Sequence, residues 1–296
     1  MPERTLTFPG PVSPGHTLAP HRRGPGDPCF QIDADGAIWR TSLQSTGPVS
    51  ARIARTAPDT VLCRAWGDGA EEFLANLPAL LGADDDGAGF TPSHPTLELA
   101  QRRVPHLRLG RTGRVLEALI PAVLEQRVQG IEAFRSWRLL VTRYGDPAPG
   151  PAPARMRVPP SARAWRAIPS WEFHRGGVDP GRMRTIAGVA ARADALERLS
   201  TAEPLTSLPG VGVWTAAEVA QRAFGDADAL SVGDYHLSNM IGWTLLGRPI
   251  DDAAMVDLLE PMRPHRYRAV RLLEVSRLAQ LPRRGPRLAR HRISGL

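Results

Sequence analysis

The chain has 296 residues, a formal net charge of +7, a pI near 10.7 and only two cysteines. This length is enough for one large hydrophobic core or two smaller ones. The cysteines are too few for a disulfide framework or a four-thiolate iron–sulfur cluster. No apolar run approaches the roughly 18 residues of a membrane span, and the N-terminus does not resemble a signal peptide. We therefore expect a soluble, cytoplasmic protein.

Residues 1–88 carry the alternating patterns and turn signals of short β-strands. Asp35-Gly36 predicts a hairpin turn, and Asp68 predicts the N-cap of a helix from Gly69 to Leu81. We therefore expect a small antiparallel α+β domain over residues 1–88. Its predicted strands are Leu6–Phe8, Thr17–Leu18, Phe30–Ile32, Ala37–Leu43, Ser50–Ile53 and Thr60–Trp66.

Apolar residues at helical spacing dominate from Thr96 onward, so residues 89–296 are predicted to form a helical domain. A long helix, Val115–Tyr144, is expected to break near Gly130, and a proline-rich crossing at 147–160 is expected to link two helical lobes. Further predicted helices are Ser161–Ile168, Arg182–Leu199, Tyr235–Leu246, Asp251–Leu259 and Pro264–Leu281. The predicted fold class is therefore α+β and predominantly α-helical.

Basic charge concentrates in a C-terminal tail, residues 281–296, which contains arginines but no acidic residue. All 37 basic side chains of the chain are arginine, whose planar fork suits phosphate groups. The absence of lysine also resembles codon bias from a GC-rich genome, so composition alone is weak evidence for a partner. We expect the tail to bind phosphates or to remain disordered.

The segment Leu208–Ala216 reads LPGVGVWTA and joins two predicted helices, Thr201–Ser207 and Val213–Phe224. Gly210 and Gly212 permit a tight turn whose amides can approach a phosphate, because no Cβ stands in the way. The turn opens onto a helix N-terminus, which carries partial positive charge. Read alone, the segment is equally compatible with an ordinary turn between helices.

This hairpin, the following helix, a loop over 225–233 and then Asp234 resemble the signature of the helix-hairpin-helix DNA glycosylase superfamily. In that superfamily a lysine at the second variable hairpin position is typical of glycosylase/lyases. Trp214 stands there instead, which is typical of the 3-methyladenine DNA glycosylase II branch. The resemblance extends over about residues 95–280 and includes the helix with Gln126 and a late PWRSxA-like segment at Pro264–Ala269.

The resemblance implies a helix-hairpin-helix helical domain and a monofunctional glycosylase that hydrolyses the N-glycosidic bond of a flipped, alkylated base. A fixed carboxylate stabilises the positive charge that develops on the sugar and can orient or deprotonate water, and Asp234 is the candidate. Because an alkylated purine already carries positive charge, one carboxylate is sufficient. Asp234 is also placed to cap a helix, and the two roles are compatible. A Schiff-base lyase route normally needs lysine, which the chain lacks.

Glu218 and Glu274 stand where the resembled branch places aromatic rings that stack on the base. Carboxylates can attract a cationic base or accept hydrogen bonds but cannot stack. The alternatives are a shifted register or two solvated helix positions. His236 and Asn239 are expected to help hold the carboxylate, the water or the DNA backbone, against an exposed or capping role. The expected substrate pocket comprises Trp214, Glu218, Glu274, Gln126 and His236.

The remaining expectations concern ligands and DNA. The expected DNA contacts are Leu208, Gly210, Val211, Gly212, Thr215, Asn239 and Arg266. The resemblance implies a Na⁺ or K⁺ ion on the backbone carbonyls of Thr206, Leu208 and Val211, and we expect no required cofactor and no iron–sulfur cluster. Met156, in the proline-rich crossing, is the candidate for a residue that wedges into the duplex.

The expected partner is damaged double-stranded DNA, bound by a monomer in the cytoplasm of a bacterium, at the nucleoid, with no membrane association. Two alternatives stay open. The first is a related glycosylase with altered specificity for hypoxanthine or other deaminated or bulky bases, motivated by Glu218 and Glu274. The second is a non-catalytic DNA-binding protein that uses the same hairpin and leaves Asp234 idle.

Overall fold

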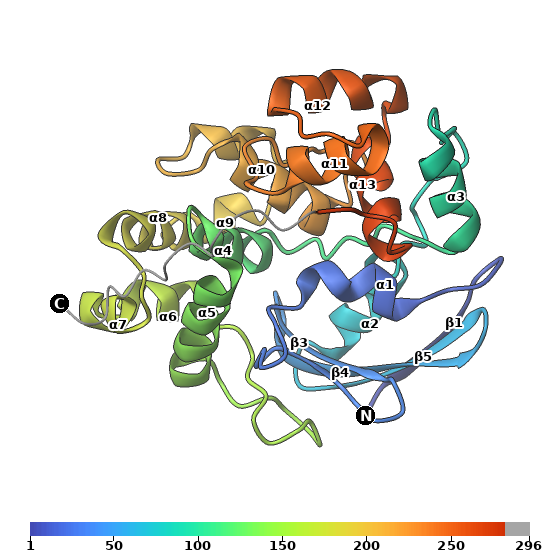
Figure 1. The fold of residues 1–296 in the computed structure, drawn as a ribbon. Coiled ribbons are helices and arrows are strands. Elements are labelled where there is room, and N and C mark those ends of the chain that lie inside the picture. Colours follow the sequence, from blue (N-terminus) through green and yellow to red (C-terminus); the bar gives the residue numbers. More distant parts are fainter. Residues whose placement is uncertain (282–296) are drawn as a thin grey trace.

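The described part of the chain, residues 1–281 of a computed structural model, contains one antiparallel sheet followed by a long series of helices (Figure 1). This arrangement confirms the predicted α+β, predominantly helical fold class. The predicted basic tail lies outside the described residues from position 282 onward. Within residues 1–281, no helix is both long and apolar enough to cross a membrane.

The N-terminal sheet has five strands in the order β1-β5-β4-β3-β2, and every neighbouring pair is antiparallel. Its strands are β1 (Glu3–Thr7), β2 (Phe30–Ile32), β3 (Ile38–Gln44), β4 (Gly47–Ala57) and β5 (Thr60–Trp66). The predicted turn at Asp35-Gly36 joins β2 to β3, because Gly36 adopts φ +83° and Asp35 accepts a hydrogen bond from the Ala37 amide at 3.0 Å. The sheet therefore confirms the predicted antiparallel unit.

Two local predictions in this region are wrong. Residues 17 and 18 belong to helix α1 (Pro14–Leu18), not to a strand, because Ser13 caps the helix and proline occupies its first turn. Asp68 does not cap helix α2 (Ala70–Leu80), whose N-cap is Gly69 without a side-chain hydrogen bond. A Cβ at Gly69 would lie 2.3 Å from the Gly47 carbonyl oxygen, so close packing on the sheet selects glycine there.

The helical part follows the predicted spacing, and the predicted long helix breaks over residues 126–129, next to Gly130 as expected. Two differences are that the helix predicted from Arg182 splits in two and that α7 is additional. The helices are α3 (Pro95–Arg103), α4 (Val115–Glu125), α5 (Gly130–Tyr144), α6 (Ala162–Ala167), α7 (Ser170–Arg175), α8 (Pro180–Ala190), α9 (Ala193–Leu196), η2 (Glu203–Ser207), α10 (Val213–Val219), η3 (Ala220–Phe224), α11 (Leu237–Leu246), α12 (Asp252–Leu259), η4 (Glu260–Met262) and α13 (Arg266–Val275). A short 3₁₀ helix, η1 (Ala19–His21), follows α1.

Two hydrophobic cores divide these helices into two groups, which we call the lobes. The first core contains buried side chains of α4 to α10, such as Leu119 and Val219, and the second contains side chains of α3 and α11 to α13, such as Ile241 and Leu273. The loop 225–233 leads from the first core to the second. It therefore places the residue that follows it, Asp234, at the junction of the lobes.

The proline-rich segment at 147–160 does not link the lobes as predicted. It joins α5 to α6, whose buried tryptophans belong to the same core. The segment packs on the sheet, because Thr41 Oγ1 donates to the Arg157 carbonyl at 2.6 Å and Ser50 Oγ donates to the Pro149 carbonyl at 2.5 Å. Met156 is only 1% exposed, so it cannot wedge into DNA and that prediction is wrong.

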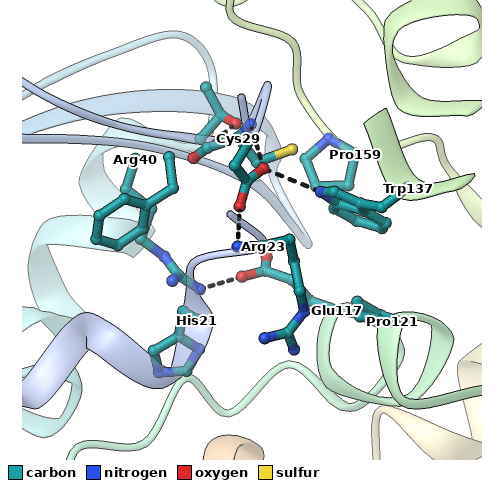
Figure 2. Close-up of a pocket in the computed structure, with 11 residues that line it drawn as sticks. His21, Arg23, Cys29, Arg40, Glu117, Pro121, Trp137 and Pro159 are labelled. Atoms are coloured by element: carbon teal, nitrogen blue, oxygen red, sulfur yellow. Dashed lines mark hydrogen bonds and ion pairs between the residues drawn. The ribbon is translucent and has the colours of Figure 1, made fainter. Parts of the chain in front are cut away.

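Buried charges join the sheet to α4 and α5 around a cavity of about 20 Å³ (Figure 2). Arg40 of β3 forms an ion pair with Glu117 of α4, and Asp27 accepts hydrogen bonds from the Arg23 amide at 2.7 Å and from Trp137 Nε1 at 2.9 Å. We call Arg23, Asp27, Arg40, Glu117 and Trp137 the interface network. Ligand pockets usually hold at least ~300 Å³, so the cavity is too small for a ligand and the interface network is structural.

Both cysteines are free and buried. Cys29 lies beside the interface network and Cys63 lies in the core of the sheet. Burial raises the pKa of the Cys29 thiol well above its ordinary range and that of Cys63 to about 12. Since the thiolate is the reactive form, both side chains act as packing residues.

Candidate functional site

The predicted hairpin forms between η2 and α10 and depends on glycine at position 210. Gly210 adopts φ +82°, and a Cβ there would lie 2.0 Å from Thr185 Oγ1 of α8. Gly212 is different, because it is exposed and a Cβ there would meet nothing within 4 Å. The first glycine is therefore required by the fold, whereas the second leaves an open face in front of the N-terminus of α10.

Gln126, the residue that follows α4, holds the hairpin through its side-chain amide. Its Nε2 atom donates to the Gly210 carbonyl at 2.9 Å and to Thr215 Oγ1 at 2.9 Å. Gln126 therefore binds the backbone of the hairpin, and its expected place in a substrate pocket stays a prediction. The side chains of Val211 and Thr215 are buried at 5% and 2% exposure, so the expected contacts of these residues with DNA stay predictions for their backbone atoms alone. Both side chains support the turn from behind.

Asp234 meets Trp214 although twenty residues separate them in the chain. Asp234 Oδ2 accepts a hydrogen bond from Trp214 Nε1 at 3.3 Å. Its Oδ1 accepts from the backbone amides of His236 at 2.8 Å and Leu237 at 3.0 Å, at the start of α11. The carboxylate is half-buried, and it makes the capping hydrogen bonds together with the contact to Trp214 of the hairpin helix.

The loop that carries Asp234, residues 225–233, is fixed from three sides, and we call it the Asp loop. Gln221 Nε2 of η3 donates to the Ala229 carbonyl at 2.9 Å. Asp252 of α12 accepts from the Gly233 amide at 2.8 Å. The Arg268 amide of α13 donates to the Ala227 carbonyl at 3.1 Å. The backbone position of Asp234 is therefore set by three elements beyond its own loop.

Arg266 anchors the same loop, and the prediction that it contacts DNA is wrong. It is 9% exposed, and its Nε and Nη2 atoms donate to the two carboxylate oxygens of Asp228 at 2.9 and 2.6 Å. Burial opposes ionisation of Asp228, but the hydrogen bonds from Arg266 outweigh it and lower the pKa of the carboxyl. The guanidinium is hydrogen-bonded to Asp228 inside the protein, so it is not available to bind a phosphate.

Glu218 and Glu274 do not face a common pocket as expected. Glu218 is buried, and its two oxygens bind Ser231 Oγ at 2.6 Å and Arg222 Nη1 at 2.7 Å. Glu274 is exposed and pairs with Arg271 at 2.5 Å. The solvated alternative therefore holds for Glu274 and fails for Glu218, whose role is internal.

A second cavity, of about 10 Å³, lies where η1, η3 and α13 meet. Its lining includes Arg222 and Arg271, the partners of the two glutamates, together with Tyr267 and His21. Burial raises the pKa of Tyr267 and lowers that of His21, whose charged form is further opposed by Arg40 and Arg222. Neither this cavity nor the one at the interface network is lined by Asp234, and neither has room for a base.

Sequence reasoning missed two exposed residues beside the hairpin and Asp234. Arg127, directly after Gln126, is exposed with φ +53°, which is an unfavourable conformation for a side chain of this size. Tyr235 is 72% exposed, and its ring contacts the ring of His236 at 4.8 Å between centroids. Backbone strain and exposure are tertiary properties, so no signal in the sequence marks either residue.

Metal binding by side chains finds no support in the described residues, where no group of three or more His, Cys, Asp and Glu is suitably arranged. His236 is exposed and Asn239 is half-buried near Asp234. Their expected contacts with water or DNA stay predictions.

Comparisons with known proteins agree with this arrangement. No protein-family model matches the chain. The chain is 30% identical over 253 residues to a protein of Mycobacterium tuberculosis described as a probable bifunctional transcriptional activator/DNA repair enzyme AlkA. This match covers 81% of the chain and 50% of that protein, so the chain spans about half the length of the curated relatives it matches.

Solved structures share the fold. The 3-methyladenine DNA-glycosylase of Archaeoglobus fulgidus superposes with a TM-score of 0.79 at 16% identity, covering 93% of this chain and 98% of that one. The 8-oxoguanine glycosylase/lyase of Clostridium acetobutylicum gives 0.72 at 11% identity, covering 93% and 96%. A yeast 3-methyladenine DNA glycosylase, Mag1 of Schizosaccharomyces pombe in complex with abasic DNA, gives 0.51 at 18% identity, covering 64% and 96%.

The fold, the glycine hairpin and the aspartate at the junction of the two lobes agree with the predicted resemblance to helix-hairpin-helix DNA glycosylases. The chain shares its fold with solved DNA glycosylases and is similar in sequence to relatives described as DNA repair enzymes AlkA, half of whose length it spans. The tryptophan in the hairpin agrees with the predicted resemblance to the 3-methyladenine DNA glycosylase II branch.

Proposed function

We propose that this chain is a monofunctional DNA glycosylase of base excision repair, which hydrolyses the N-glycosidic bond of an alkylated base in damaged double-stranded DNA. The observation that supports this most is the hydrogen bond between Trp214 of the hairpin helix and Asp234. It couples the segment that grips DNA to the one carboxylate expected to act. A deoxyribose docked by the hairpin would therefore meet Asp234 at a fixed place.

Asp234 acts through its Oδ2 atom. Oδ1 already accepts two backbone hydrogen bonds, whereas Oδ2 accepts only the longer one from Trp214 Nε1. Oδ2 therefore keeps lone pairs that face the developing positive charge on the sugar or take a proton from water. Because its orientation is set before substrate binds, little reorganisation opposes the reaction.

The proposed lack of lyase activity depends on the absence of a suitable amine. Lyase chemistry proceeds through a Schiff base, which normally needs lysine, and the chain contains none. Trp214 occupies the hairpin position where lyases of the superfamily carry that lysine. The proposed product is therefore an intact strand with an abasic site.

DNA binding is proposed for the exposed side of the hairpin. Gly210 and Gly212 are exposed, and Val213 is 66% exposed at the N-terminus of α10. Backbone amides at such a site favour phosphate oxygens. Arg127 directly follows Gln126, which is hydrogen-bonded to the hairpin, so the positive charge of Arg127 would also favour binding of a phosphate there. The affinity of the proposed monomer for DNA should then fall as salt rises.

A monovalent cation, Na⁺ or K⁺, is proposed on the carbonyls of Thr206, Leu208 and Val211, with no other cofactor. These three residues lie in or beside the turn, where the Leu208 carbonyl accepts a hydrogen bond from the Val211 amide at 3.0 Å. A bound cation would bring positive charge to the phosphate-facing turn.

The decisive experiment replaces Asp234 by asparagine. Asp234→Asn keeps the size and the capping oxygen but removes the negative charge, so release of methylated bases from duplex DNA should fall at least about 100-fold. DNA affinity should remain, because the hairpin is untouched. The matched control is Asp257→Asn, an exposed aspartate on α12. Unchanged release by Asp234→Asn would refute the catalytic assignment, and strand cleavage by the wild type would refute the lack of lyase activity.

A second candidate, altered base specificity, is favoured by one observation. The positions that carry stacking aromatics in the resembled branch hold Glu218 and Glu274, and neither side chain offers a ring to a base. A panel of duplexes with methylated purines, hypoxanthine and uracil separates the two candidates. Preferential release of hypoxanthine or uracil would favour the second.

A further inference from the structure

A chain of buried hydrogen bonds runs from η3 to the Asp loop and has Glu218 at its centre. Ser231 Oγ donates to Glu218 Oε1 at 2.6 Å and also accepts from Gln221 Nε2 at 3.0 Å. The Ser231 carbonyl accepts the backbone amide of Asp234 at 3.1 Å. A single serine therefore connects Glu218 to the residue that carries the proposed chemistry.

Glu218 is fixed on its other side by Arg222. The guanidinium binds Glu218 Oε2 at 2.7 Å, and its Nε donates to the Pro20 carbonyl of η1 at 3.0 Å. Both side chains have only 12% exposure, so the ion pair is little screened by solvent. Burial opposes the charge of Arg222, but neighbouring Glu218 outweighs it and raises the pKa of the guanidinium, which therefore stays charged.

The local backbone makes this arrangement possible. Residues 220–224 form a π-helical turn, which is wider than an α-helical turn and frequent at functional sites. The turn directs Gln221 to the Asp loop while Arg222 reaches η1. Both carboxylate oxygens face partners inside the protein and the side chain is buried, so Glu218 presents no exposed acceptor to a base.

We propose that Glu218 is a positioning residue, which holds Ser231 and thereby sets where the Asp234 carboxylate stands. The inference depends on the proposed function of Asp234 and assigns Glu218 no contact with substrate. Loss of the carboxylate would release Ser231, let the Asp loop shift and move Asp234 relative to the sugar. Displacements of about 1 Å can cost about 100-fold in rate.

A positioning role has a signature that a base-reading role lacks. If Glu218 acts through Asp234, every excised base should be affected by the same factor, because the sugar and the carboxylate are common to all. If Glu218 instead reads the base, its removal should change the ranking of substrates. DNA affinity should stay unchanged in the first case, since the hairpin does not depend on Ser231.

The test compares four single variants and one double variant of the full chain on two duplexes that differ in the damaged base. Glu218→Ala and Ser231→Ala should each lower the single-turnover rate of base release by about 10- to 100-fold, with Kd for DNA within about twofold. Glu218→Gln should retain more activity, since its amide oxygen still accepts from Ser231. The matched control is Glu98→Ala, an exposed glutamate paired with Arg102 at the same i, i+4 spacing.

The double variant Glu218→Ala with Ser231→Ala should be no slower than the slower single variant, because both changes break one connection. Ser231→Ala keeps the Glu218–Arg222 pair, so it tests the proposal even where Glu218→Ala fails to fold. Normal rates in Ser231→Ala, or a reordering of the two bases in any variant, would overturn the inference. Absence of base release by the wild type on every duplex would instead overturn the proposed function.

Discussion

Asp27 and Asp234 have the same kinds of hydrogen-bond donors and opposite surroundings. Each carboxylate accepts from two backbone amides and one tryptophan indole, Trp137 for Asp27 and Trp214 for Asp234. Asp27 is 2% exposed inside the interface network, and burial raises its pKa. Asp234 is half-buried beside an open hairpin.

The donor set alone therefore does not mark a functional carboxylate. At Asp27 all three hydrogen bonds are 2.9 Å or shorter, and the group is enclosed by two elements of the fold. At Asp234 the indole contact is longer, at 3.3 Å, and the side chain is half-buried. Enclosure converts such a carboxylate into a structural residue, and access leaves it available for chemistry.

The largest expected effect separates the two aspartates by stability. Asp27→Ala leaves three buried donors without acceptors, each costing about 1 kcal/mol or more, so the free energy of unfolding should fall by about 3 kcal/mol. Asp234→Ala removes a helix cap at a half-exposed site and should cost about 1 kcal/mol. Urea unfolding followed by circular dichroism measures both changes.

The order of the two variants should be reversed for base release, where Asp234→Ala has the larger effect. Base release per folded molecule should survive in Asp27→Ala and disappear in Asp234→Ala. Equal losses of stability in the two variants would show that exposure does not distinguish these sites and would contradict the comparison.

The sequence predicted the parts of the site that depend on local signals. The glycines of the hairpin, the spacing to Asp234 and the break after α4 all follow from backbone preferences that neighbouring residues determine. The predicted role of Asp234 as a cap is confirmed for the same reason. Such features need no knowledge of distant contacts.

The supporting contacts could not be predicted, because they join residues far apart in the chain. Arg266 reaches Asp228 across 38 positions, and Trp137 reaches Asp27 across 110. The position of Glu218 in the motif predicts a pocket residue. The motif does not show that a π-helical turn directs Gln221 to Ser231, which in turn binds Glu218. Met156 was attractive as a wedge because its proline-rich segment suggested a loop, whereas packing on the sheet buries it.

Substitutions of the two hairpin glycines should have intermediate effects on stability and DNA binding. They test whether the hairpin next to Asp234 presents an open face. Gly210→Ala forces an alanine into φ +82° and against Thr185, so the protein should lose about 1 to 3 kcal/mol and also bind DNA more weakly. Gly212→Ala should leave the melting temperature unchanged, because its Cβ meets no protein atom within 4 Å.

Gly212→Ala should nevertheless weaken DNA binding, since the new methyl group points to the face proposed for phosphate. Calorimetric melting and fluorescence anisotropy with a duplex at two salt concentrations separate these effects. Full DNA affinity in Gly212→Ala would contradict the proposed phosphate contact while leaving the fold argument for Gly210 intact.

The smallest expected effect is a dependence of stability on pH that arises from His21, beside the interface network. Burial, and then Arg40 and Arg222, lower the pKa of His21 well below its ordinary value of 6.5. Below about pH 6.5 the unfolded chain therefore binds a proton that the folded protein refuses, and stability falls as pH falls. The slope attributable to His21 is at most about 1.4 kcal/mol per pH unit.

His21→Gln should reduce this slope between pH 6.5 and 5, as measured by urea unfolding at several pH values. Asp27 has the opposite sign, because its raised pKa makes the folded state bind a proton more readily, so acid relieves part of the cost of burying its charge. Comparison of His21→Gln with the wild type holds the Asp27 contribution constant. If stability falls equally with pH in both proteins, His21 binds its proton equally well in the folded and unfolded chain. That result would contradict the enclosed surroundings inferred for His21.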